Sequence, residues 1–166
     1  MDAMGLDKSR IALGQSAHPF SCGSHDDLRI TMGACEGQSL LISILDVVHE
    51  AGHSLYAGNL PRRLANQPLG GYQSMWIHES QSLFWEMQVA RSPEFMEFIS
   101  NVIREELGVD DPAFSADNLR KLATRVEPGL IRIEADEVTY PAHIILRYDI
   151  EHNLINGTLA PKDVPA

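Results

Sequence analysis

The sequence predicts a mainly α-helical domain, with antiparallel helices and one small β element near residues 28–33. In residues 38–57, apolar side chains recur at the three- and four-residue spacing of one helix face. Ser92-Pro93-Glu94 is typical of a helix start, with an N-cap, a proline in the first helical position and an acid in the first turn. Residues 28–32 alternate apolar and polar side chains, as a short strand does.

The N-terminal third is expected to hold a loop, the strand and the first helix. Residues 1–17 mix polar residues with glycines and are interpreted as a loop, so the strand at 28–33 is the only one expected. The helix at 38–57 should turn one apolar stripe towards the core. That stripe consists of Leu41, Leu45, Val48, Gly52 and Leu55. Gly58 to Pro61 is a strong stop signal.

Four further helices are expected after a connection at 62–71. Their predicted ranges are 72–90, 93–107, 115–124 and 134–156. Residues 130–133 could form a strand or begin the last of these helices. Pro141 should kink or restart that helix, because proline lacks the N–H that an internal helical position needs.

Length and composition narrow the class of protein. A chain of 166 residues with 44% apolar content suits a single globular domain, residues 1–166. A net charge of −10 argues against nucleic acid and anionic membranes as partners. No apolar stretch approaches the roughly 20 residues that a bilayer requires. The N-terminus has no apolar signal region, so we expect a cytoplasmic protein.

The two cysteines, Cys22 and Cys35, form neither a disulfide framework nor a zinc-binding spacing. We interpret them as reduced thiols, which is what a cytosolic protein usually contains.

The strongest chemical signal is residues 49–53, which read His-Glu-Ala-Gly-His. Histidines four apart on a helix point about 40° apart, so His49 and His53 can bind one metal ion. Glu50 between them is then free to act as a general base. A chance match to this pattern arises in about one such chain in fifty, so the surroundings must support it.

A catalytic zinc takes three protein ligands, and the helix expected at 72–90 offers the third. Glu79 carries carboxylate oxygens that suit zinc, and its apolar neighbours suggest a largely buried helix. Those neighbours are Trp76, Ile77, Leu83, Phe84 and Trp85. His78 points about 100° away from Glu79, so we expect it to pack beside the site rather than bind metal. The alternative for Glu79 is an ordinary acid on a helix surface.

These motifs resemble the carboxypeptidase Taq family of metallocarboxypeptidases. The matching stretches follow the family's order along the chain. They are His18-Pro19-Phe20, Asp27 to Thr31 (the D-x-R-x-T signature), residues 49–53, His78 to Ser82 with Trp85-Glu86, and Ile131 to Pro141. The resemblance implies a mostly helical, cytosolic, homodimeric enzyme that removes C-terminal residues from peptides with zinc or cobalt.

By that resemblance His49, His53 and Glu79 bind the metal, and Glu50 is the general base. Arg132 is the candidate for binding the substrate's C-terminal carboxylate, because a guanidinium can donate two parallel hydrogen bonds to a carboxylate. An ion pair with Glu134 or Asp136 is the structural alternative.

His18 and Arg29 are expected to line or brace the groove. Alternatively, they hold the small strand against the helices through buried hydrogen bonds.

Members of the family are much longer than this chain. The chain is therefore interpreted as the metal-binding core of a longer enzyme, without the family's N-terminal helical part and later C-terminal segments. Three functions stay open: a working metal-dependent carboxypeptidase, a non-catalytic metal-binding or assembly module, and an endopeptidase or aminopeptidase with the same metal chemistry. Loss of groove walls would leave apolar helix faces that favour association with another chain.

Overall fold

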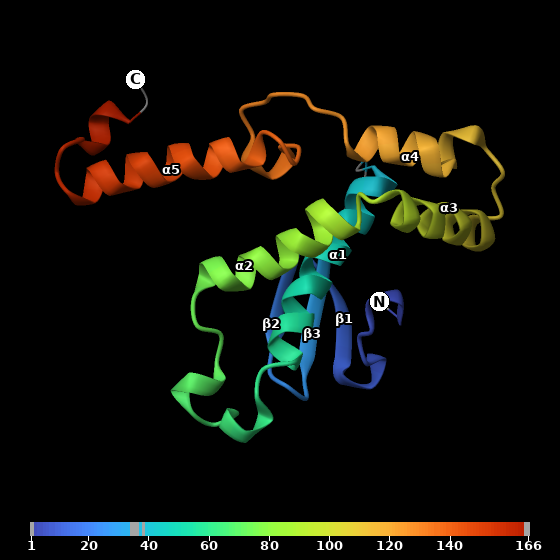
Figure 1. The fold of residues 1–166 in the computed structure, drawn as a ribbon, viewed down its shortest axis with the longest axis horizontal. Coiled ribbons are helices and arrows are strands. Elements are labelled where there is room, and N and C mark those ends of the chain that lie inside the picture. Colours follow the sequence, from blue (N-terminus) through green and yellow to red (C-terminus); the bar gives the residue numbers. More distant parts are fainter. Residues whose placement is uncertain (1, 34–36, 38, 165–166) are drawn as a thin grey trace. The chain divides into compact units, whose positions relative to one another are not determined.

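The structure is a computed structural model that describes residues 2–33, 37 and 39–164. Cys35 lies outside the described residues. The chain divides into two compact units, Met1–Arg120 and Lys121–Ala166, and each is described by itself (Figure 1). The mainly helical fold class is confirmed, since the described residues form five α-helices and one small sheet. The single domain stays a prediction.

The sheet of the first unit has three strands, in the order β1-β3-β2. β3 (Leu28–Gly33) is central, pairing in parallel with β1 (Ile11–Ser16) and antiparallel with β2 (Phe20–Gly23). The expectation of a loop over residues 1–17 and of a single strand was therefore wrong. Four of the six residues of β1 are exposed, so β1 lacks the alternation that marks a strand in sequence. Backbone hydrogen bonds to β3 hold it instead.

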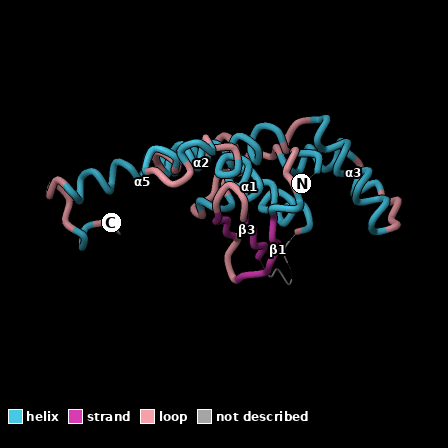
Figure 2. Tube along the Cα trace, turned by 90° about the horizontal axis from the view of Figure 1, so that it is seen from below, coloured by secondary structure: helices cyan, strands magenta, loops and turns pink. Residues whose placement is uncertain are grey.

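Helix α1 (Leu40–Gly58) packs on β2 and β3, and this packing makes the core of the first unit (Figures 1 and 2). Leu28 and Ile30 of β3 are almost fully buried. The predicted stripe of α1 is buried from Leu41 to Gly52, and only Leu55 is half-buried. The apolar period therefore located both the helix and the face it buries.

Helix α2 (Met75–Leu83) continues without a break into a π-helix, Phe84–Val89. Sequence periodicity predicted one continuous α-helix here, because a π segment has no simple apolar period. The expectation of a largely buried helix was also wrong. Trp76 is 74% exposed and Phe84 is 54% exposed.

Helices α1 and α2 come close together at Gly52. A Cβ atom at this position would lie 2.7 Å from the Ser82 Cα and 3.2 Å from the Gln81 carbonyl oxygen. Ser82 is itself fully buried. Only glycine allows the two backbones to come this close, so Gly52 sets the spacing between α1 and α2.

Helix α3 (Pro93–Leu107) begins and ends as predicted. The Ser92 hydroxyl accepts a hydrogen bond from the Phe95 N–H, and Gly108 ends the helix in the left-handed conformation. Helix α4 (Ala116–Ala123) crosses the boundary between the two units.

The second unit contains helix α5 (Tyr140–Ile155). Residues 130–133 form neither a strand nor the start of a helix, since Ile131 is extended and a 3-10 turn follows at Arg132–Glu134. Pro141 does not kink the helix. It lies in the first turn, where its missing N–H has no helical partner to lose.

Asp136 organises the turn before α5. Its carboxylate accepts hydrogen bonds from the N–H groups of Glu127, Val138 and Thr139 and from the Thr139 hydroxyl, at 2.8–3.0 Å. Burial opposes the charge, but the hydrogen bonds from Thr139, Glu127 and Val138 outweigh it and lower the pKa of Asp136 to about 2.

Within the part of the chain that the structure describes, no helix combines the length and the apolar character needed to cross a bilayer.

Replacing Gly52 by alanine should destabilise the first unit by about 1–2 kcal/mol. The added methyl group would overpack α1 against α2, and the free-energy cost of this overpacking exceeds the gain from the higher helix propensity of alanine. Urea unfolding of wild type and variant measures the difference. Gly71→Ala is the matched control, because the nearest atom to its Cβ would be 3.7 Å away. Equal stability of Gly52→Ala and wild type would contradict the close helix contact.

The stabilisation from Asp136 should depend on pH. Its pKa in the folded state lies below the ordinary value of 3.8, so the stabilisation is complete above that value and is lost as the pH falls towards 2. The difference in unfolding free energy between wild type and Asp136→Asn should be constant near neutral pH and shrink on acidification below about pH 4. A carboxyl that titrates near 3.8 by NMR in the folded protein would refute this assignment.

Candidate metal centre

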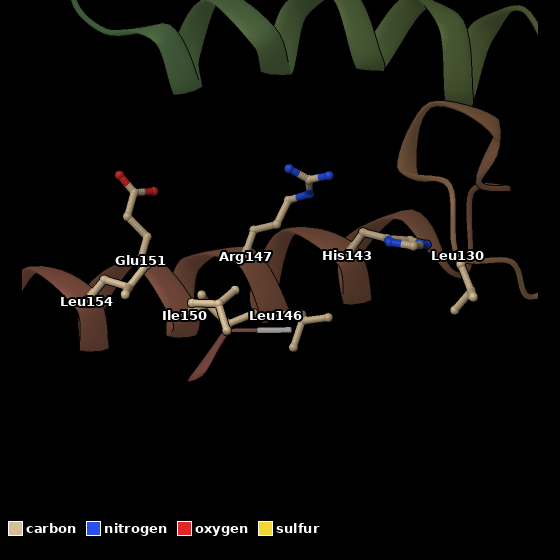
Figure 3. A pocket seen from close by; sticks show the side chains of 8 residues that line it. Leu130, His143, Leu146, Arg147, Ile150, Glu151 and Leu154 are labelled. Atoms are coloured by element: carbon tan, nitrogen blue, oxygen red, sulfur yellow. The ribbon is translucent and has the colours of Figure 1, made fainter. Parts of the chain in front are cut away.

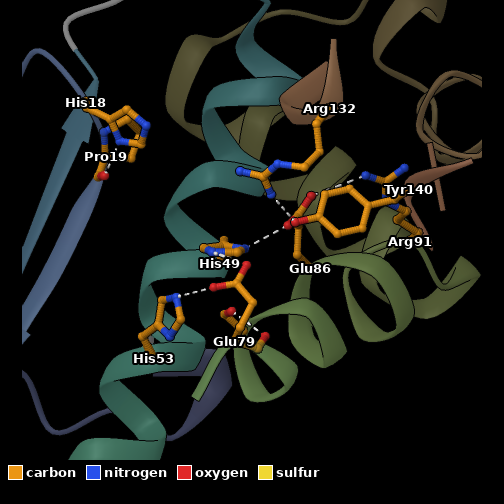
Figure 4. Close-up of polar contacts among 10 residues, drawn as sticks. His18, Pro19, His49, His53, Glu79, Glu86, Arg91, Arg132 and Tyr140 are labelled. Carbon is orange, nitrogen blue, oxygen red and sulfur yellow. Dashed lines mark hydrogen bonds and ion pairs between the residues drawn. The ribbon is translucent and has the colours of Figure 1, made fainter. Parts of the chain in front are cut away.

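His49 and His53 lie one turn apart on α1 and face the same side, as the helical spacing predicts (Figure 4). Their ring centroids are 4.9 Å apart, and the rings stand nearly perpendicular. Both side chains are mostly buried, at 19% and 10% exposure. Bulk water therefore has little access to the imidazole nitrogens from most directions.

Glu79 of α2 points between the two imidazoles (Figure 4). Its Oε1 is 3.7 Å from the His49 Nε2, and its Oε2 is 3.4 Å from the His53 Nε2. One ligand atom from each residue lies within 4.8 Å of the others, so the three residues form a group that could hold a metal ion. Glu79 is half-buried, so its surroundings are less enclosed than expected from its apolar neighbours.

The donor set fits a small divalent ion. Ligands at 2.0–2.1 Å in a tetrahedral zinc site stand about 3.3 Å apart. The 3.4 Å between the His53 Nε2 and the Glu79 Oε2 is close to that spacing, whereas the 3.7 Å contact of the His49 Nε2 is to the other carboxylate oxygen, Oε1. One ligand atom from each residue lies within 4.8 Å of the others, so an inward movement of the side chains would close the site. Two imidazole nitrogens and one carboxylate oxygen are also the donor chemistry of a catalytic zinc site, which leaves a fourth position free.

Glu50 is buried in α1 between the two histidines in sequence. Its charge contributes to the electrostatic environment of His49.

Glu86 and Arg91 belong to the site, although our interpretation of the sequence did not assign them a role. The Nδ1 of His49 lies 2.8 Å from the Glu86 Oε2, and Arg91 lies 3.3 Å from the Glu86 Oε1. Burial opposes the charged imidazole, but the hydrogen bond and charge of Glu86, with Glu79 and Glu50, raise the pKa of His49. The sequence spacing could have pointed to Glu86, because it follows Glu79 by seven residues, which places both on one face of a regular α-helix.

His78 lies beside the three residues rather than among them. Its ring stacks on His53 at 4.4 Å and meets Tyr56 and Tyr72 edge to face. Burial, together with the neighbouring His53, lowers the pKa of His78 and favours the neutral ring.

Arg29 lies on β3 and His18 in the bend between β1 and β2, and both are exposed. The His18 Nδ1 is 2.6 Å from its neighbour's carbonyl oxygen, that of Pro19. Arg29 forms a two-point ion pair with Asp27, which raises the pKa of the guanidinium and lowers that of the carboxyl. Neither contact is buried, so buried hydrogen bonds do not explain these two residues.

Arg132 belongs to the second unit, in the turn before α5. Its Nη1 donates a hydrogen bond of 2.5 Å to the Tyr140 hydroxyl, and its guanidinium carbon is 5.6 Å from the Tyr140 ring centroid. Asp136, one of the two acids suggested as its partner, is engaged in the turn described above.

The sequence matches the carboxypeptidase Taq (M32) metallopeptidase family over residues 1–166. Among curated relatives, thermostable carboxypeptidase 1 of Pyrococcus furiosus is 39% identical over 158 residues, which are 95% of this chain and 31% of the relative. Thermostable carboxypeptidase 1 of Thermus thermophilus is 38% identical over 166 residues, covering 99% of this chain and 32% of the relative.

Solved structures agree with this match. Metallocarboxypeptidase 1 of Trypanosoma cruzi superposes with a TM-score of 0.91 at 44% identity, covering 99% of this chain and 32% of that one. The Pyrococcus furiosus carboxypeptidase gives a TM-score of 0.87 at 38% identity, with 99% and 33% coverage. The chain thus spans about a third of the length of the relatives it matches.

The resemblance seen in the sequence motifs is confirmed over that third. The chain belongs to the carboxypeptidase Taq (M32) family of metallopeptidases.

Proposed function

We propose that this chain carries the metal-binding core of a carboxypeptidase that releases C-terminal residues from peptides. The observation that carries the proposal is the convergence of His49, His53 and Glu79 from two helices, with Glu50 buried beside them. The names of the relatives support the substrate class, because they are carboxypeptidases.

His49, His53 and Glu79 would hold the ion, and we propose zinc, with cobalt as a substitute. Such an ion would lower the pKa of a coordinated water and polarise the scissile carbonyl. Glu50 would accept the proton of the attacking water and pass it to the leaving amine, as a general base and then a general acid. The mostly buried imidazoles limit access of bulk water to this proton transfer.

Selection of the peptide C-terminus requires a cation, and we assign this role to Arg132. Its guanidinium can donate two parallel hydrogen bonds to a terminal carboxylate. The hydrogen bond to Tyr140 would restrict the side chain and reduce the entropy lost on binding. We propose His18 and Arg29 as further groove residues, because both side chains are exposed, His18 between β1 and β2 and Arg29 on β3.

We further propose a cytoplasmic homodimer as the working form. The alternative function is a non-catalytic metal-binding or assembly module, and one observation favours it. A pocket along α5 of the second unit has a mostly apolar lining (Figure 3). The lining residues are Leu130, His143, Leu146, Arg147, Ile150, Glu151, Leu154 and Val164. Such a surface favours association with protein.

Replacing Glu50 by glutamine should lower kcat by about 10²- to 10⁴-fold, since the amide cannot accept the proton. The zinc content of the purified variant should equal that of wild type. Glu97→Gln removes the same charge at an exposed position and is the control for both measurements. Turnover that survives in Glu50→Gln would disprove the assigned base. Zinc bound without turnover in wild type would favour the non-catalytic module.

Replacing Arg132 by methionine should lower kcat/KM by about tenfold or more for peptides with a free C-terminal carboxylate. The variant and wild type should differ little on the same peptides with an amidated C-terminus, which offers no charge to bind. Arg147 is an exposed arginine of the same unit, and Arg147→Met should leave kcat/KM unchanged for both kinds of peptide. An equal loss on both kinds of peptide would instead assign Arg132 to holding Tyr140.

A further inference from the structure

Glu86 contacts the ring nitrogen of His49 that does not face Glu79, and the corresponding nitrogen of His53 has no such contact among the described residues. The His49 Nδ1 lies 2.8 Å from the Glu86 Oε2, on the side of the ring away from Glu79. The Nδ1 of His53 is buried and has no hydrogen-bond partner in the part of the chain that the structure describes. The two histidines are therefore held differently, although the sequence motif treats them alike.

The contact selects one form of the His49 ring. A neutral imidazole has one N–H donor and one acceptor nitrogen, and a carboxylate can only accept. Pairing with Glu86 therefore places the proton on Nδ1 and leaves the lone pair on Nε2. That nitrogen is the one 3.7 Å from the Glu79 Oε1, where a metal ligand is required.

Arg91 in turn restrains Glu86 through the contact of 3.3 Å between them. Both side chains are mostly buried, at 10% exposure for Arg91 and 17% for Glu86. A pair in such surroundings interacts more strongly than the same pair in water, and either partner left alone would be costly.

The π segment explains how residues five apart can pair. In an α-helix, residues five apart point about 140° away from each other. In a π-helix the hydrogen bonds join residues five apart, so their side chains lie one above the other. The bond from the Ala90 N–H to the Trp85 carbonyl, at 2.7 Å, has this spacing immediately before Arg91. Arg91 lies in the turn that follows the π segment Phe84–Val89, and from there its guanidinium reaches the Glu86 carboxylate.

We infer that Glu86 is a positioning residue that orients His49 for metal binding, and that Arg91, in the turn after the π segment, holds Glu86 in place. This inference rests on the proposed metal site. Outer hydrogen-bond partners of histidine ligands of this kind contribute about 10- to 100-fold to metal affinity.

The decisive measurement is the dissociation constant for Zn²⁺, obtained by competition with a chromophoric chelator on metal-free protein. Glu86→Gln should raise this constant about 10- to 100-fold. Glu97→Gln, which makes the same charge change at an exposed site of α3, should leave it unchanged. A rise of less than tenfold in Glu86→Gln relative to Glu97→Gln would overturn the inference.

A second readout separates orientation from a general loss of structure. Long-range ¹H–¹⁵N spectra of the metal-free protein, at a pH where the ring is neutral, should show His49 protonated on Nδ1 in wild type. Glu86→Leu, which cannot accept this hydrogen bond, should shift the His49 proton towards Nε2. Circular dichroism and urea unfolding test whether that variant keeps the fold. An unchanged tautomer would overturn the assignment even if the affinity fell.

The same experiment distinguishes failure of the inference from failure of the proposed site. His53→Ala removes a proposed ligand and should abolish tight Zn²⁺ binding. Wild type that binds no Zn²⁺ would overturn the metal site itself, and this inference with it. Tight binding by wild type, lost in His53→Ala but kept in Glu86→Gln, would leave the site standing and overturn only the role of Glu86.

Discussion

The metal centre depends on the close contact between α1 and α2 at Gly52. His49 and His53 belong to one helix and Glu79 to the next, so their distances are set by the spacing of two backbones. A side chain at Gly52 would collide with the backbone of Ser82 and Gln81. The glycine inside the His-Glu-Ala-Gly-His stretch thus keeps α2 near enough for Glu79 to reach both imidazoles.

The sheet supports this arrangement from the other side of α1. β3 carries Leu28 and Ile30 into the core, and α1 packs against the sheet (Figure 2). The two histidines of α1 face Glu79 of α2. A helix fixed on one face by apolar packing can position polar groups on the other face with little freedom.

The charges around the site require compensation. Glu50, Glu79 and Glu86 bring three carboxyl groups to one region, and Arg91 lies against Glu86. Buried carboxylates are stable only with cations or hydrogen bonds. A divalent ion between His49, His53 and Glu79 would add positive charge beside these carboxyl groups, so metal binding and local stability are expected to be linked.

The sequence by itself determined the α-helical class, the first helix with its buried stripe, the start of α3 at Ser92 and the three residues that converge as possible ligands. These features follow from local rules: side-chain period, capping and the fixed angle between residues on a helix.

The tertiary structure alone decided the rest. β1 forms because β3 supplies backbone partners. The π segment and the Glu86–Arg91 pair depend on the packing of α2 against α1. Arg132 turns towards Tyr140 rather than Asp136, because the backbone of that turn already occupies the Asp136 carboxylate. Each of these outcomes depends on contacts between residues whose sequence patterns do not predict the pairing, and therefore only folding could decide them.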